Sequence, residues 1–249
     1  MLRLAYRGTA YAGWQRQPNA RSVEEVIDTA LSTVLGEPVK LVGCGRTDAG
    51  VHASVYAAHF EFTGTLPPRL LGRLNRYLPE DIALYALYRV PQDVHARFSA
   101  QRRSYRYDLS QRKDPFRPDT IAWLPQLTDL DRDAMQAAAA LLLDYAEFAP
   151  FCKTNSDAYT MRCALQRSEW EFGQLTWRYH VTADRFLRGM VRLIVGMCLE
   201  VGRGRLELDG VRQALAQQRA LPRPYSVPAA GLYLTEVNYP NVDSWKLMG

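Results

Sequence analysis

The sequence is poor in cysteine and contains no long hydrophobic run. Four cysteines occur among 249 residues, without the spacing of a metal site or a disulfide framework. Scattered cysteines of this kind are typical of reduced cytoplasmic thiols. No stretch approaches the roughly 18 apolar residues of a membrane span, and residues 1–6 are too short and too alternating for a signal peptide. We therefore expect a cytoplasmic protein that does not enter a membrane and binds no metal.

Lysine is also scarce, whereas arginine is abundant. The chain has 31 basic residues, of which only Lys40, Lys113, Lys153 and Lys246 are lysines, and its formal net charge is +5. Arginine forks match phosphate geometry and stack on bases, so this balance favours a nucleic-acid partner. A GC-rich genome also produces arginine-rich proteins, and composition alone leaves both explanations open.

Hydrophobic periodicity predicts both strands and helices, and 249 residues are enough for one long domain or two smaller ones. Strands are predicted at 2–6, 39–42, 51–62, 82–90, 165–172 and 175–183, and in the second half of 95–107. Helices are predicted at 23–35, after a capping box at Ser22 and Glu25, and at 67–78, 130–143, 186–196 and 208–218. Polar connecting segments are predicted at 111–118 and 155–157.

The stretch Gly45-Arg46-Thr47-Asp48-Ala49-Gly50-Val51-His52 predicts a tight turn between two strands that presents one carboxylate. Gly50 can take a positive φ that other residues avoid. Arg46 lies two residues from Asp48, where it can hold the carboxylate charged or contact a phosphate. An Asp in a glycine-rich turn also commonly caps its own turn, so a structural role for Asp48 is the alternative.

Two further stretches combine charge with apolar or aromatic residues. In 103–107, arginines alternate with Tyr105 and Tyr107, a pattern suited to a nucleic-acid groove. Tyr105 could instead be a core residue, and Tyr107 is expected to pack in the core. In the apolar segment 186–196, Arg192 is costly to bury unless it is paired or reaches solvent. Trp14 and Arg16, in the loop after the first strand, predict either loop packing or an RNA-facing wall.

Together these motifs resemble the TruA family of tRNA pseudouridine synthases. The family shows Gly-Trp-Gln-Arg-Gln, as at 13–17 here, and a Gly-Arg-Thr-Asp-Ala-Gly-Val-His signature, as at 45–52. Its His-Ala-Arg-Phe-Ser-Ala, Phe-Leu-x-x-Met-Val-Arg-x-x-Val-Gly and Ala-Pro-x-x-Gly-Leu-x-Leu patterns match at 95–100, at 186–196 and, with Val in place of Ala, at 227–234. The resemblance spans Tyr6 to Tyr239. Arg7, where the family has Asp, and the loose match around Glu147 are departures.

The resemblance implies a fold of two similar α/β halves, with antiparallel sheets flanked by helices and an active-site cleft between them. We place the halves at 1–100 and 101–249. It implies a homodimer that isomerises uridine to pseudouridine at positions 38, 39 and 40 of the tRNA anticodon stem-loop, without a cofactor or a metal.

The resemblance also assigns site residues. Asp48 is the expected catalytic residue, and Arg192 is expected to form an ion pair with it. Tyr105 is expected to stack on the target nucleotide, Leu232 to support its base, and Arg46 to bind substrate. Two other classes stay open: a tRNA-binding or tRNA-folding protein without chemistry, and a glycosidase-like hydrolase that uses a pair of carboxylates.

Overall fold

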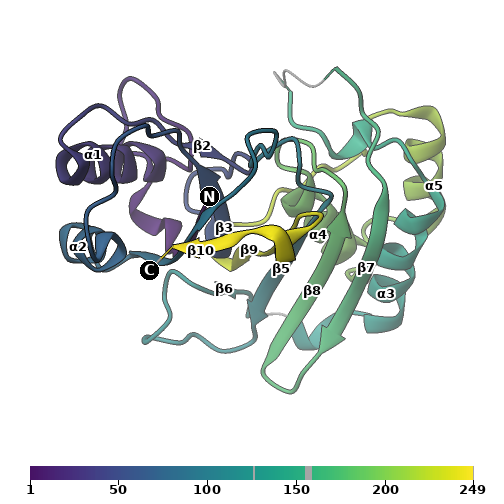
Figure 1. Cartoon of the computed structure of the whole chain (residues 1–249). Helices are drawn as coiled ribbons and strands as arrows, with labels where there is room; N and C mark the ends of the chain where they lie inside the picture. Colours follow the sequence, from purple (N-terminus) through teal and green to yellow (C-terminus); the bar gives the residue numbers. More distant parts are fainter. Residues whose placement is uncertain (126, 155–158, 249) are drawn as a thin grey trace. The chain divides into compact units, whose positions relative to one another are not determined.

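The computed structural model describes residues 1–125, 127–154 and 159–248, and within these it is a mixed α/β protein (Figure 1). The helices are α1 (Val23–Leu35), α2 (Leu70–Tyr77), α3 (Arg132–Leu141), α4 (Met190–Gly202) and α5 (Leu208–Gln217). The strands are β1 (Leu2–Tyr6), β2 (Val42–Gly43), β3 (His52–His59), β4 (Ile82–Arg89), β5 (Arg102–Ser110), β6 (Ala122–Trp123), β7 (Leu165–Phe172), β8 (Thr176–Ala183), β9 (Leu232–Asn238) and β10 (Lys246–Met248). The chain divides into two compact units, Met1–Arg102 with Tyr233–Gly249, and Arg103–Leu232.

The sheet of the first unit has the strand order β10-β4-β1-β3-β9, and the short β2 pairs with β3. Its pairs are antiparallel except β3 with β9, which run parallel. Leu2, Leu4 and Tyr6 alternate along β1 and are buried, as the period-two pattern predicts. Helices α1 and α2 pack against each other, and α2 packs against β4. The core of this unit therefore lies between the sheet and the two helices.

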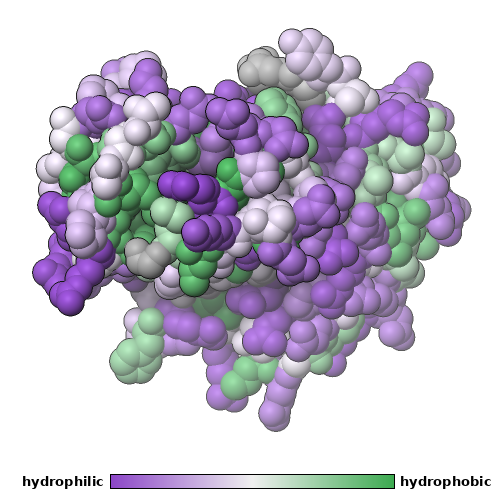
Figure 2. All heavy atoms as spheres, in the orientation of Figure 1, coloured by the Kyte–Doolittle hydropathy of each residue, from purple (hydrophilic) through white to green (hydrophobic). Residues whose placement is uncertain are grey.

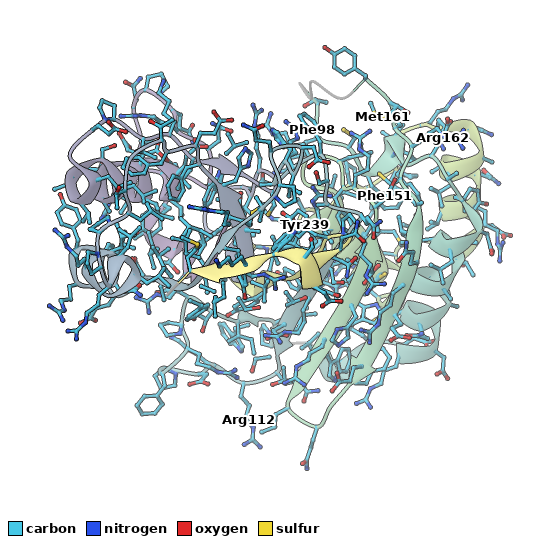
Figure 3. The ribbon with its side chains drawn as sticks, viewed as in Figure 1. Phe98, Arg112, Phe151, Met161, Arg162 and Tyr239 are labelled. Carbon is cyan, nitrogen blue, oxygen red and sulfur yellow. The ribbon has the colours of Figure 1, made fainter. Side chains whose placement is uncertain are left out.

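The last strands of the chain return to this first unit. Tyr239 follows β9 and donates its hydroxyl to the carbonyl of Ala96 at 2.6 Å, and its ring lies 5.3 Å from that of Trp245 (Figure 3). β10 then pairs with β4, Leu247 opposite Tyr88. These contacts join segments that are far apart in sequence, and local patterns do not predict them.

The second unit is built on the antiparallel strands β5, β8 and β7, with β6 running parallel to β5. The strands predicted at 165–172 and 175–183 are confirmed as β7 and β8, which form a hairpin that turns at Gly173 and Gln174. Helix α3 packs on β7, α4 and α5. Ser168 on β7 donates to the carbonyl of Ala139 on α3 at 2.6 Å, which fixes the face that the helix covers.

The register separates the two faces of this sheet. Tyr105 lies opposite Val181 and Tyr107 opposite Tyr179, on the face that α3 covers. The other face carries charged side chains, and Figure 2 shows hydrophilic residues over β7 and β8. There Arg106 and Arg178 pair with the buried Asp108, at 2.8 and 3.7 Å. The alternation predicted for 103–107 is thus confirmed.

Several predicted boundaries differ from the observed ones, and for two of them the structure gives the reason. Strand 39–42 reduces to Val42–Gly43, because the amide of Val39 donates to Ser32 at 2.9 Å and that of Leu41 to Asp28 at 2.8 Å, both side chains of α1. The helix predicted at 186–196 spans Met190–Gly202 instead, and it begins later because Gly189 takes a left-handed φ of 72° before it. The polar segment predicted at 155–157 lies outside the described residues.

None of the helices within residues 1–125, 127–154 and 159–248 has the length and hydrophobicity of a transmembrane span.

Candidate active site

Asp48 lies on the loop that joins β2 to β3, as the sequence predicts. The loop closes tightly, because the amide of Val51 donates to the carbonyl of Asp48 at 3.1 Å. Gly50 has a φ of 78°, which confirms the positive φ expected there. A glycine thus lets the chain turn directly after the carboxylate-bearing residue.

The segment between β1 and α1 holds this loop from one side. The amide of Trp14 donates to the carbonyl of Thr47 at 3.2 Å, and the amide of Gly50 donates to the carbonyl of Tyr11 at 3.2 Å. Tyr6, the last residue of β1, adds a hydrogen bond of 2.8 Å between its hydroxyl and that of Thr47. Hydrogen bonds from a neighbouring segment therefore fix the residues on both sides of Asp48, which limits where its carboxylate can lie.

Buried aromatic rings support the same loop. Trp14 is 1% exposed and stacks on Tyr56, with ring centroids 4.0 Å apart. The Tyr56 hydroxyl donates to the carbonyl of Gly45, the first residue of the signature. Gly43 lies against both rings, and a Cβ there would meet the Tyr56 hydroxyl oxygen at 2.3 Å. Of the two roles predicted for Trp14, the structure confirms packing.

Tyr11, whose carbonyl accepts from the amide of Gly50, and His52, which directly follows the loop, both hold its C-terminal end. The Tyr11 hydroxyl donates to Asp81 at 2.6 Å, and burial together with this bond raises the pKa of Tyr11, so the hydroxyl stays protonated. The amide of Gly8 donates to Nδ1 of His52 at 3.0 Å, and His52 is 1% exposed. Because Nδ1 accepts, the bond favours the tautomer with its proton on Nε2. His52 thus has a structural role in this unit.

Arg46 is exposed and borders a cavity of about 200 Å³ beside the Asp48 loop. Its Nε donates to Oε1 of Gln15 at 3.4 Å. The cavity is lined by Trp14, Gln15, Glu24, Leu41, Val42, Gly43, Gly45, Arg46 and Arg97. Sequence reasoning named Arg46 but missed Gln15, Glu24 and Arg97 as its neighbours. Gln15 belongs to the Gly-Trp-Gln-Arg-Gln motif at 13–17, and this motif was the sequence signal that could have indicated its role.

Tyr105 belongs to the second unit, on β5. It is partly exposed, and its ring meets Phe186 edge to face, with centroids 5.0 Å apart and planes at 83°. Tyr107, two residues on, is fully buried and donates its hydroxyl to the carbonyl of Pro228 at 2.8 Å. Burial raises the pKa of Tyr107 strongly. The prediction that Tyr107 packs in the core is confirmed.

Arg192 also belongs to the second unit, on the first turn of α4. Its Nε donates to the carbonyl of Val227 at 2.7 Å, and the amide of Val227 donates back to the carbonyl of Arg192 at 3.3 Å. This reciprocal pair holds the segment that leads to Leu232, which is 6% exposed and begins β9. The structure thus brings together Arg192 and the chain before Leu232 within one unit.

The five predicted site residues are divided between the units. Arg46 and Asp48 lie in the first, and Tyr105, Arg192 and Leu232 lie in the second. The ion pair expected between Asp48 and Arg192 stays a prediction. Within the described ranges, no group of three or more histidine, cysteine, aspartate or glutamate side chains could hold a metal ion.

Comparison with known proteins gives full-length matches. A sequence profile described as tRNA pseudouridine synthase matches residues 4–99 and 138–240, which include every predicted site residue except Tyr105. The tRNA pseudouridine synthase A of Parabacteroides distasonis is 43% identical over 239 residues, covering 95% of this chain and 94% of the relative. The protein of that name from Bacteroides thetaiotaomicron is 44% identical, covering 95% of this chain and 89% of the relative. The one from a Nostoc species is 38% identical, covering 96% of this chain and 86% of the relative.

Proposed function

The chain belongs to the tRNA pseudouridine synthase family, and we propose that it isomerises uridine to pseudouridine in the anticodon stem-loop of tRNA with Asp48 as its catalytic residue. The reaction breaks the N1–C1′ glycosidic bond, turns the uracil and joins C5 to C1′. The proton on C5 leaves and N1 gains one, so substrate and product are isomers and no oxidant is needed. Positions 38, 39 and 40 of tRNA are the proposed targets.

The observation that carries this proposal is the set of hydrogen bonds that fixes the loop of Asp48. A nucleophile or base must be held in near-attack geometry, because small misplacements cost large factors in rate. Hydrogen bonds to Thr47 and from Gly50 and Val51 fix the backbone on both sides of Asp48. A loop that merely connected two strands would not need such support from a segment more than 30 residues earlier.

The other site residues are proposed to bind and orient the nucleotide. The target must leave its stack before C1′ and the ring become accessible. Tyr105 is proposed to stack on it, and Leu232 to support its base from the apolar side. Arg192 is proposed to form an ion pair with the Asp48 carboxylate. Arg46 is proposed to contact a backbone phosphate near the target.

The family's architecture extends the proposal to the whole molecule. We propose that residues 1–100 and 101–249 act as two similar halves with the substrate bound between them. We also propose a homodimer and a cytoplasmic location, since both the tRNA substrate and the scattered cysteines fit that compartment.

Conversion of an unmodified tRNA transcript by the purified chain tests the function. Pseudouridine should form at one or more of positions 38 to 40, mapped by chemical labelling and reverse transcription. The Asp48→Asn variant should form none while its affinity for tRNA stays within about threefold, because it keeps the shape of the side chain and loses its basicity. Asp209→Asn, a matched loss of charge at an exposed residue of α5, should retain full activity.

Three results would refute the proposal. Full activity in Asp48→Asn would remove the catalytic assignment. Binding of tRNA without any product from the unaltered chain would favour the binding-protein alternative. Release of free uracil would favour the hydrolase.

A further inference from the structure

A chain of hydrogen bonds links helix α1 to Arg46. Glu24, in the first turn of α1, accepts at Oε2 from the side-chain amide of Gln15 at 2.7 Å and from the backbone amide of Arg16 at 2.7 Å. Gln15 in turn accepts at Oε1 from Nε of Arg46 at 3.4 Å. All four residues belong to the first unit. The guanidinium of Arg46 is therefore connected, through one amide, to a carboxylate on a helix.

Glu24 is built into this position. It is 7% exposed, and a buried carboxylate is costly unless it is hydrogen-bonded. Two N–H groups meet its Oε2, and its place at the start of α1 lets the helix dipole favour its charge. Its neighbour Glu25 instead contacts the exposed Arg16 side chain at 3.3 Å. The two adjacent carboxylates thus have different environments and provide a matched comparison.

The amide of Gln15 has two chemically different ends, and Glu24 selects their orientation. A carboxylate accepts but does not donate, so the NH₂ group must face Glu24 and the carbonyl oxygen must face Arg46. Without the carboxylate, the amide is free to turn its NH₂ group toward the guanidinium, where two donors oppose each other. Glu24 therefore determines whether Gln15 attracts or repels the side chain of Arg46.

The cavity beside these residues has two guanidinium groups and one carboxylate in its wall, and this net positive charge favours an anion. Arg46, Gln15 and Glu24 all line it, and Arg97 brings a second guanidinium to its wall. Gly43 and Gly45 also line it, so a ligand can approach the backbone there. At about 200 Å³ the cavity is smaller than the pockets that enclose drug-sized molecules. A phosphate group with part of its ribose is the chemistry that fits this size and charge.

We propose that Glu24 and Gln15 are positioning residues that hold the guanidinium of Arg46 over this cavity to bind a phosphodiester of the RNA substrate. The inference rests on the proposed function and adds to it a binding subsite and the two residues that organise it. Neither positioning residue needs to touch the reacting uridine. Their effect is on the affinity of the full chain for RNA, through Arg46.

The test measures the dissociation constant for an unmodified tRNA transcript across a series of salt concentrations. Replacing Arg46 by Met removes one cation, so the slope of log affinity against log salt should fall by about 0.7 to 0.9. Glu24→Ala and Gln15→Ala should each weaken binding about fivefold to tenfold, as expected for a weakened charge-assisted hydrogen bond, and should reduce the slope in the same direction. Glu24→Gln keeps an acceptor oxygen and should restore most of the affinity lost in Glu24→Ala.

A double variant distinguishes positioning from general weakening of the fold. If Glu24 acts through Arg46, then Glu24→Ala combined with Arg46→Met should bind no more weakly than Arg46→Met alone. Glu25→Gln, the control one residue along α1, should bind within about twofold of the unaltered chain. Should Glu24→Ala fail to fold, Gln15→Ala tests the same chain of contacts, because Gln15 is exposed.

Additive losses in the double variant, or an unchanged salt slope in Gln15→Ala, would overturn the inference. The outcome is separable from that of the proposed function. Pseudouridine formation by the unaltered chain, together with normal binding by Gln15→Ala and Glu24→Ala, would refute the positioning role alone. Absence of product from the unaltered chain would refute the enzyme, whatever the binding data show.

Discussion

Replacing Gly13 by Ala should displace the Asp48 loop without touching any group proposed to act in the reaction. Gly13 has a φ of 99°, and an added Cβ would lie 2.3 Å from the carbonyl oxygen of Thr47 and 3.1 Å from the carbonyl carbon of Asp48. Ordinary contacts begin at about 3.4 to 4 Å, so Thr47 must move by roughly 1 Å. A shift of that size at a reacting group costs about 100-fold in rate. Backbone strain adds about 1 to 3 kcal/mol of lost stability.

Gly36 provides the control, because it has a φ of 79° and nothing within 4 Å of an added Cβ. Gly36→Ala should be destabilised by a comparable strain yet keep its activity per folded molecule. The assays are thermal unfolding of both variants and single-turnover pseudouridine formation with enzyme in excess. A folded Gly13→Ala protein with a rate within twofold of the unaltered chain would refute the link between this contact and catalysis.

Two further predictions concern charged groups. Burial raises the pKa of Asp28 from 3.8 to about 6, so the native state binds this proton more tightly and the group's contribution to stability falls as pH rises through 4 to 6. In urea titrations, Asp28→Asn should have the same free energy of unfolding as the unaltered chain near pH 4. At pH 8 its free energy of unfolding should be higher by about 1 to 2 kcal/mol, after allowance for solvent screening. Equal stability of the two proteins at both pH values would contradict this. Arg192→Met should lower the single-turnover rate at least about tenfold and leave the affinity for tRNA within about threefold, because it removes the cation proposed to pair with Asp48. An unchanged rate would exclude that pairing.

The elements that the sequence predicted well are those in which local signals agree. Helix α1 runs from Val23 to Leu35, with Ser22 accepting from the amide of Glu25 at 3.2 Å and Gly36 in a left-handed conformation at its end. The N-cap residue, the hydrophobic periodicity and the glycine that ends the helix all lie within this one stretch of sequence. The other half of the predicted capping box differs, because the Glu25 carboxylate contacts Arg16 rather than the start of the helix.

Features that depend on distant residues could not be predicted in this way. Residues 39–41 alternate as a strand does, yet two of their backbone amides donate to side chains of α1 instead of to a neighbouring strand. The parallel pairing of β3 with β9 places His52 opposite Tyr233, across most of the chain. Among the candidate site residues, the signature placed Asp48 on its loop, whereas the contacts of Arg46 with Gln15 depend on how two loops pack.

The start of α1 and the position of Asp48 are parts of one hydrogen-bonded assembly. The first N–H groups of a helix have no partner within it and must find one elsewhere. Here the amides of Val23 and Glu24 donate to the carbonyls of Gly13 and Trp14, at 3.2 and 3.0 Å, and the amide of Trp14 donates to Thr47. The helix terminus thus fixes the segment that in turn fixes the Asp48 loop. The Glu24 carboxylate accepts from the side chain of Gln15 and from the backbone amide of Arg16, the two residues that follow Trp14. It can therefore stabilise the start of the helix and, through Gln15, orient Arg46 as proposed.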